Sequence, residues 1–227
     1  MRIAFAGDIH GRICLMYEKI QEHGQADMIF QVGDFGVFLD EASLDRATVK
    51  HNGFIPDFSE YHSRVRRAPI TTYFIKGNHE DFDFLEAHEQ DNEVAGNIFY
   101  LPNQTIIKPD RRIKIGVLGG NWSWAYYMEG KIKKKKDERQ YFSEQDVEFF
   151  RKHPVDILLF HAYPQGVMKN GEDKGSPRLA ELVEEMQPRY AFHGHRHMYN
   201  RAKIGSTEVI GLDIIKGEGK FIYVLDL

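Results

Sequence analysis

One apolar segment that ends in an aspartate, residues 28–34, most strongly limits what this chain can fold into. Four of the five residues before Gly33 are apolar, a pattern that predicts a short buried strand. Gly33 lets the backbone turn sharply, so the Asp34 carboxylate would project past the strand end, where α/β enzymes place functional groups. An isolated aspartate of this kind is more often a turn residue, so its meaning depends on the rest of the sequence.

Four other strand-like segments also lead into residues that can bind metals. Residues 3–7 lead into Asp8 and His10, and residues 70–75 lead into Asn78, His79 and Glu80. Residues 156–160 lead into His161, and residues 190–194 lead into His195 and His197. Carboxylate and imidazole groups are typical ligands of zinc, manganese and iron. The sequence therefore predicts that five strand ends contribute to one metal cluster.

The ordered motifs of these strand ends resemble those of the calcineurin-like metallophosphoesterases over nearly the whole chain. The motifs are Asp8-x-His10, Gly33-Asp34, Gly77-Asn78-His79-Glu80, His161 and Gly194-His195-Arg196-His197. Within that superfamily, the flanking residues 68–70, 97–101, 154–157 and 175–177 are most similar to those of RNA lariat debranching enzymes. The resemblance implies an α/β fold, a four-layer α/β/β/α sandwich of two mixed sheets flanked by helices.

The resemblance also implies a role for each motif residue. Asp34 would bridge two divalent ions (Mn, Fe or Zn) about 3.5 to 4 Å apart. One ion would be bound by Asp8, His10 and His197, and the other by Asn78, His161 and His195. His79 would lie over the phosphate and act as the general acid or stabilise charge. Glu80 would orient a ligand or His79 by hydrogen bonding.

Two departures from the family pattern limit the resemblance. Debranching enzymes commonly have a cysteine where this chain has Asp8, so we expect two complete metal sites and a general phosphodiesterase rather than a strict debranching enzyme. Many relatives carry a second acid and an arginine after the Gly-Asp pair, whereas Phe35, Gly36 and Val37 follow here, which weakens the analogy with protein phosphatases. His193 is outside the predicted ligand set because the last motif begins at Gly194.

Length and composition favour one domain covering residues 1–227, since 227 residues with 42% hydrophobic content suffice for one core. A net charge of −4 gives no chain-wide positive field for nucleic acid or an anionic membrane. Cys14 is the only cysteine, which excludes an internal disulfide and fits a reducing compartment. No signal peptide fits before Asp8 and no apolar run is long enough to cross a membrane, so we expect a cytoplasmic protein.

Periodicity and capping residues predict the remaining elements. Helices are expected over residues 12–24, 58–65, 80–88, 143–152 and 176–187, an irregular helix within 35–57, strands of a second sheet over 97–101, 105–108 and 112–118, and a closing antiparallel set over 202–227.

An aromatic and lysine-rich segment near residues 121–142 is predicted to be a loop insertion. Its candidate substrate-binding residues are Trp122, Trp124, Lys133, Lys134, Lys135 and Lys136. Aromatic side chains can stack on bases and lysines can contact phosphates, so the segment could bind RNA or DNA. Lysine runs are more often only solvated surface, and that alternative stays open.

The sequence leaves three classes of function to compare. The leading hypothesis is a two-metal phosphodiesterase that acts on nucleic acid or nucleotides. The alternatives on the same fold are a phosphomonoesterase for a small molecule or phosphoprotein, and a non-catalytic scaffold that binds proteins. The presence of both Asp34 and His79 favours an enzyme over a scaffold. A metallo-β-lactamase type of hydrolase would have its His-x-His pair early in the chain, whereas here the pair comes late.

Overall fold

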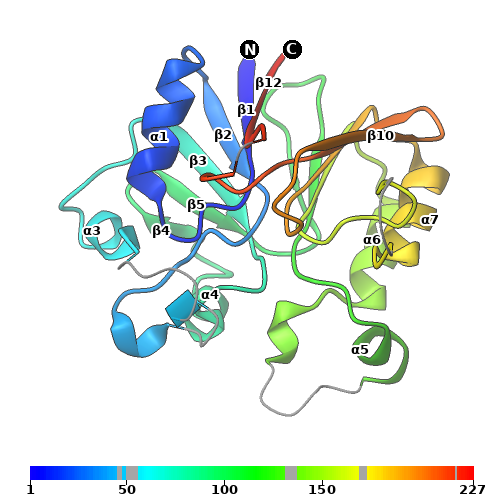
Figure 1. The fold of residues 1–227 in the computed structure, drawn as a ribbon, viewed down its shortest axis with the longest axis horizontal. Helices are drawn as coiled ribbons and strands as arrows, with labels where there is room; N and C mark the ends of the chain where they lie inside the picture. The colour runs from blue at the N-terminus through cyan, green and yellow to red at the C-terminus, as the bar shows by residue number, and fades with distance from the viewer. Residues whose placement is uncertain (45–47, 50–55, 131–136, 169–172, 218) are drawn as a thin grey trace.

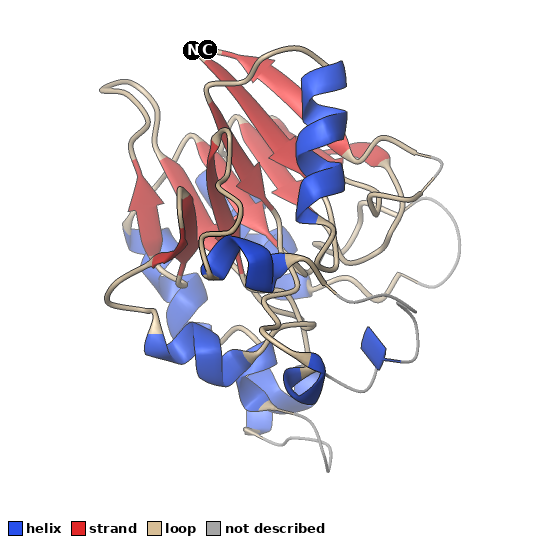
Figure 2. Ribbon diagram, turned by 90° about the vertical axis from the view of Figure 1, so that its left-hand side faces the viewer, coloured by secondary structure: helices blue, strands red, loops and turns tan. Residues whose placement is uncertain are grey.

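Two six-stranded sheets pack face to face and carry helices on their outer faces (Figures 1 and 2). The structure is a computed structural model and describes residues 1–44, 48–49, 56–130, 137–168, 173–217 and 219–227. The first sheet has the order β12 (Ile222–Asp226), β1 (Arg2–Ala6), β2 (Met28–Gln31), β3 (Thr71–Ile75), β5 (Ile98–Leu101) and β4 (Glu93–Ala95). The second has the order β10 (Asn200–Ile204), β11 (Thr207–Gly211), β9 (Tyr190–His193), β8 (Ile157–Phe160), β7 (Ile115–Leu118) and β6 (Thr105–Ile107).

Each sheet has four parallel strands in its centre and an antiparallel strand at each edge. In the first sheet β1, β2, β3 and β5 are parallel, and in the second β11, β9, β8 and β7 are parallel. At the edges of the first sheet, β12 pairs antiparallel with β1 and β4 with β5. At the edges of the second sheet, β10 pairs antiparallel with β11 and β6 with β7. The carboxyl ends of parallel neighbours lie at one edge of a sheet, which places the predicted ligands of each sheet together.

Three apolar clusters hold the layers together and confirm the predicted α/β/β/α sandwich. Between the sheets, the rings of Phe5 and Phe192 stack with centroids 4.0 Å apart. Outside the first sheet, Ile13 and Met16 of α1 (Ile13–Glu22) are fully buried, and α3 (Phe58–His62) and α4 (Phe82–Ala87) cover the same cluster. Outside the second sheet, α6 (Glu144–Lys152) and α7 (Pro177–Met186) bury apolar side chains against β8 and β9.

The two helices on the second sheet begin where the capping residues predicted. Ser143 and Asp146 form a capping box in which each side chain accepts the other's backbone N–H. Ser176 accepts the backbone N–H of Leu179, and Pro177 occupies the first helical position. Local hydrogen bonds of this kind are readable from sequence because both partners lie within one turn.

Several predicted elements differ from the structure. The helix expected over residues 58–65 ends at His62, and Val65 is 77% exposed. The strand expected from residue 112 begins at Ile115, because the Asp110 side chain accepts two backbone N–H groups in a turn. Strand β4 was not predicted, and β5, which was expected in the second sheet, pairs with β3 in the first. Where an irregular helix was expected within residues 35–57, the described residues contain the 3₁₀ turn η1 (Glu41–Ser43) and a helical pair at 48–49.

The C-terminal strands do not form one antiparallel set. Strands β10 and β11 form an antiparallel hairpin in the second sheet, whereas β12 crosses to the first sheet and pairs with β1. Figure 1 shows β12 beside β1, with the two chain ends together. No helix among the described residues is long and apolar enough to span a membrane.

A helix lies within the segment that was expected to be a loop near residues 121–142. Helix α5 (Trp124–Glu129) begins at Ser123, whose side chain accepts the Tyr126 N–H, and ends at Gly130 with a φ of 62°. A 3₁₀ turn, η2 (Glu138–Gln140), follows later in the segment. A serine cap and a left-handed glycine are ordinary helix boundaries, so this helix was readable from the sequence.

Candidate metal centre

The carboxyl ends of five strands from both sheets converge on one cluster of side chains. In the first sheet, β1 is followed by Asp8 and His10, β2 by Asp34, and β3 by Asn78. In the second sheet, β8 is followed by His161, and β9 by His195 and His197. The donor atoms form two groups, Asp8 with His10, Asp34 and His197, and Asp34 with His161 and His195. Within each group all donor atoms lie within 4.8 Å of one another, and Asp34 belongs to both.

The first group brings two imidazole nitrogens unusually close. The Nε2 atoms of His10 and His197 are 3.2 Å apart. His197 Nε2 is 3.0 Å from an Asp8 carboxylate oxygen, and His10 Nε2 is 3.8 Å from an Asp34 oxygen. Two imidazole lone pairs at this separation repel unless a proton or a cation lies between them. With two carboxylates beside them, this donor set fits a divalent cation.

The second group is built around the fully buried His161. Its Nδ1 lies 3.0 Å from the carbonyl oxygen of Val32 and donates to it, which leaves the Nε2 lone pair available for a metal. That Nε2 is 3.4 Å from Asp34 Oδ1 and 3.2 Å from Asn78 Oδ1. The Asn78 amide oxygen therefore lies where a neutral oxygen ligand can complete this group.

Asp34 links the two groups and is itself fixed by the backbone. Its Oδ1 accepts the N–H of Asn78 at 2.7 Å and the N–H of His79 at 2.8 Å. Asp34, His10, His195 and His197 all have left-handed φ angles, between 47° and 67°. Such conformations are costly for residues other than glycine and are concentrated at functional sites, where the surrounding structure enforces them.

The charges of the cluster suit metal binding. Burial alone would raise the pKa of Asp34, but the surrounding imidazoles, His161 foremost, hold that pKa far below its usual range. Burial and the neighbouring His161 lower the pKa of His195 to about 4, and burial lowers the pKa of His10. These shifts favour an ionised Asp34 and neutral His10 and His195, the protonation states that metal ligands need, whereas the hydrogen bond to Asp8 raises the pKa of His197.

The Glu80 side chain links, by hydrogen bonds, the two loops that carry Asp34 and Asn78. Its carboxylate accepts the N–H of Phe35 at 2.8 Å, Gly36 at 2.9 Å, Val37 at 3.1 Å and Gly77 at 3.4 Å. Burial, with a smaller contribution from Asp34, raises the pKa of Glu80 to about 8, and the backbone N–H groups oppose this rise. Glu80 therefore joins the backbone of these two loops directly, as an orienting role would require.

Two motif glycines let the backbone pass directly against the carboxylates. A Cβ on Gly77 would overlap Asp34 Oδ1, and a Cβ on Gly194 would overlap Asp8 Oδ1. The N–H that follows Gly194, that of His195, donates to both Asp8 oxygens at 3.0 and 3.1 Å. Only glycine leaves room for the carboxylates at these points.

The remaining predicted residues lie in different surroundings. The His79 ring is 5.3 Å from the ring of His10, beside the first group. Trp122 is partly buried and stacks on Phe142 at 5.6 Å, so one face of its ring packs against the protein. Trp124 is 56% exposed. Lysines 133–136 lie outside the described residues.

Sequence reasoning assigned no role of its own to Asn121, which contacts the centre. Asn121 follows the carboxyl end of β7 through Gly119 and Gly120, and its Nδ2 donates to Asn78 Oδ1 at 3.4 Å. A polar residue after a strand and two glycines is the same signal that marked Asp34. Beside it lies a cavity of about 230 Å³ whose lining includes Asn121, Trp122, Tyr163, Lys174, His195 and Arg196.

Comparison with known proteins gives the family of this fold and centre. Lariat debranching enzyme A of Xenopus laevis is 28% identical over 270 aligned positions, which cover all of this chain and 50% of that protein. The Homo sapiens lariat debranching enzyme is 27% identical, with 49% of its length covered. The chain thus spans about half the length of these curated relatives.

Solved structures show the same architecture. The crystal structure of TT1561 from Thermus thermophilus aligns with a TM-score of 0.59 at 16% identity, covering 94% of this chain and 89% of that one. At this identity the likeness concerns the fold alone. The profile of the calcineurin-like phosphoesterases matches residues 1–199, and the chain therefore belongs to the calcineurin-like phosphoesterase family.

Proposed function

We propose that this chain is a phosphodiesterase that uses two divalent metal ions and acts on nucleic acid or nucleotides. The observation that carries the proposal is the sharing of Asp34 between two groups of donor atoms. A carboxylate has two oxygens and can serve two cations at once, and each cation then needs its own set of further ligands. Asp8, His10 and His197 would supply one set, and Asn78, His161 and His195 the other.

The chemistry of the donors supports the choice of Mn, Fe or Zn. The proposed ligands offer carboxylate, imidazole and amide groups and no thiolate, which suits Mn, Fe or Zn. Divalent ions held there would supply the positive charge that polarises a phosphate ester and lowers the pKa of water. The neutral Asn78 adds an oxygen ligand without adding negative charge, so an anionic phosphate meets less repulsion.

The proposed role of His79 rests on its attachment to the centre. Its backbone N–H donates to Asp34 Oδ1 at 2.8 Å, which fixes the start of the side chain beside the proposed bridging carboxylate. Its imidazole would protonate the leaving oxygen or stabilise the developing charge. The adjacent Asn78 would remain a ligand, so neighbouring residues would divide metal binding and proton transfer between them.

The preference for a diester rests on the relatives. The matched proteins are named lariat debranching enzymes. The motifs of this chain resemble those of RNA lariat debranching enzymes, and that resemblance implies cleavage of a phosphodiester bond. Asp8 replaces the cysteine that is common in those enzymes, which favours two complete sites and a broader diester range. A phosphomonoesterase on the same centre is the second candidate. A scaffold role is disfavoured because each predicted ligand and His79 is present.

We also propose a single domain and, from the single Cys14, a cytoplasmic location.

Metal analysis combined with paired substrates tests the proposal. Wild-type protein should bind two ions per chain and hydrolyse bis(p-nitrophenyl) phosphate faster than p-nitrophenyl phosphate. Asp34→Asn should lower the metal content and abolish activity, because two cations would then face each other without the bridging charge. Asp91→Asn, at an exposed aspartate, is the control and should behave as wild type. Two ions and near-normal turnover in Asp34→Asn would contradict the bridge, and faster monoester hydrolysis by wild type would favour the phosphomonoesterase.

A further inference from the structure

The 230 Å³ cavity beside His195 adjoins the candidate metal centre. His195 belongs both to the cavity lining and to the second group of donor atoms. Asn121 also lines the cavity, and it donates to Asn78 Oδ1 at 3.4 Å while its own Oδ1 accepts the N–H of Trp122 at 2.7 Å. A group that enters the cavity would therefore lie next to a phosphate held at the centre.

Arg196 places an uncompensated positive charge at this cavity. Its guanidinium carbon lies 5.4 Å from the centre of the Tyr163 ring, a cation–π contact. Tyr163 is only 4% exposed and its hydroxyl accepts the Lys174 N–H at 3.0 Å, so the ring is a fixed support. Arg196 itself is exposed, and none of the described carboxylates forms an ion pair with it.

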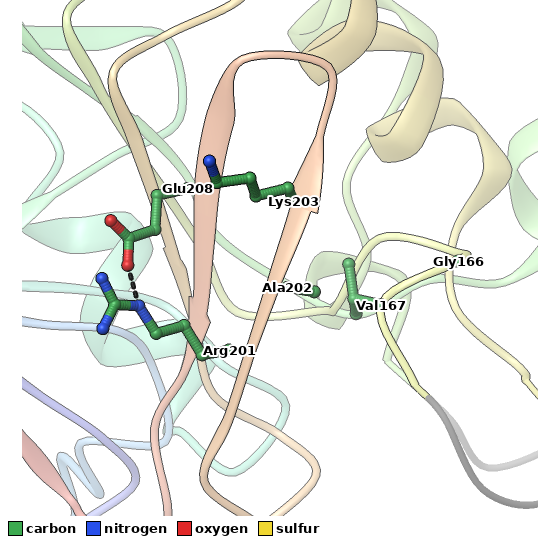
Figure 3. A pocket seen from close by; sticks show the side chains of 6 residues that line it. All are labelled: Gly166, Val167, Arg201, Ala202, Lys203 and Glu208. Atoms are coloured by element: carbon green, nitrogen blue, oxygen red, sulfur yellow. Dashed lines mark hydrogen bonds and ion pairs between the residues drawn. The ribbon is translucent and has the colours of Figure 1, made fainter.

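Other arginines of the chain contrast with Arg196. Arg139 pairs with three carboxylates and Arg151 also pairs with three. Figure 3 shows Arg201 on β10, beside a separate and larger cavity, with its guanidinium paired to Glu208. The charges of these arginines are used within the protein, whereas the charge of Arg196 is available to an anion from solution.

We propose that Arg196 binds the phosphate next to the scissile one, so that the preferred substrate is a polynucleotide with at least two consecutive phosphates. This inference rests on the proposed phosphodiesterase function and deepens it. The planar guanidinium matches the geometry of a phosphate, and its support on Tyr163 reduces the freedom lost on binding. Because His195 and Arg196 are adjacent in the chain, one short turn would address two consecutive phosphates, one at the metal centre and one at the cavity.

The test compares substrates that differ by one phosphate. A dinucleotide has a single phosphodiester, and a trinucleotide has two. Arg196→Gln should lower the ratio of kcat/KM for the trinucleotide to that for the dinucleotide by roughly 10- to 100-fold, the usual worth of a hydrogen bond to a charged group. The change should appear mainly in KM. Arg196→Lys should restore part of the ratio, because the charge remains but the two-pronged geometry is lost.

Arg201→Gln is the matched control, since it removes the same charge at an exposed arginine of the second sheet. It should leave the ratio unchanged. An unchanged ratio in Arg196→Gln, or an equal loss on both substrates, would overturn the inference, since Arg196 would then either contact no phosphate or act on the metal centre itself.

A binding measurement decides the inference even if the wild-type protein cleaves no diester, an outcome that would refute the proposed function. The affinity of chelator-treated protein for a fluorescent single-stranded oligonucleotide is measured by anisotropy over a range of salt. Arg196→Gln should reduce the slope of log affinity against log salt by about 0.7, the contribution of one phosphate contact on a single strand. An unchanged slope would overturn the inference independently of catalysis.

Discussion

Replacing Glu80 by glutamine tests whether one carboxylate holds the two loops of the centre. Glutamine has the same shape, but its amide nitrogen cannot accept a hydrogen bond. One Glu80 oxygen accepts the N–H of Phe35 and Gly77, and the other accepts those of Gly36 and Val37. Whichever way the glutamine amide turns, two buried N–H groups then face another donor.

The magnitude follows from the number of N–H groups left without an acceptor. A buried donor without a partner costs about 1–3 kcal/mol, so the two donors should lower the free energy of unfolding by about 2–6 kcal/mol. For a domain of this size that corresponds to a decrease in Tm of roughly 4–24 °C. The loops carrying Asp34 and Asn78 should also loosen, and metal affinity should fall with stability.

The assay is urea denaturation of chelator-treated protein at about pH 6. Chelation removes the stabilisation that bound metal would add. This pH lies below the raised pKa of Glu80, so the wild-type carboxyl group is protonated and the variant does not also relieve the cost of a buried charge, while both carboxyl oxygens can still accept hydrogen bonds. Glu22→Gln, at an exposed glutamate of α1, is the control and should stay within about 0.5 kcal/mol of wild type. If Glu80→Gln also stays within that range, the four hydrogen bonds do not hold the loops together.

Three further changes test other parts of the centre. His79→Ala should keep the wild-type metal content and lose roughly 10²- to 10⁴-fold in kcat, and metal loss would instead make His79 a ligand. Gly194→Ala should push a Cβ against Asp8 and weaken metal binding in equilibrium dialysis. Gly96→Ala is the control, because its added Cβ would have its nearest neighbouring atom at 3.6 Å, and it should leave metal binding unchanged. Equal metal affinities of the two variants would refute this account. Replacing residues 133–136 by serine should flatten the salt dependence of oligonucleotide binding, and an unchanged slope would mean a solvated surface.

Local signals in the sequence predicted the strands and the turns that carry the candidate ligands. Asp8, Asp34 and His161 each follow an apolar run, and the structure places each at the end of a parallel strand. Family resemblance then predicted the layers and the order of the motifs. Ser143 and Ser176 marked helix starts because a cap and its partner are only three residues apart.

Features that depend on distant contacts could not be read from the sequence. The Glu80 carboxylate meets N–H groups 43 to 45 residues away, and no local pattern around Glu80 points to them. The support of Arg196 by Tyr163 joins residues from the ends of two different strands. Strand β12 pairs with β1 although nearly the whole chain separates them, so its apolar run alone could not reveal its sheet.

The candidate centre lies between the two sheets, so metal binding there would stabilise the contact between them. Asp8, His10 and Asp34 follow strands of the first sheet, whereas His161 and His195 follow strands of the second. Ions bound between these residues would link the two sheets where the carboxyl ends of their parallel strands meet. At a free metal concentration 1,000 times the dissociation constant, one such ion adds about 4.1 kcal/mol to stability. Metal supply would thus set how stably the two sheets pack together, as well as whether the proposed reaction proceeds.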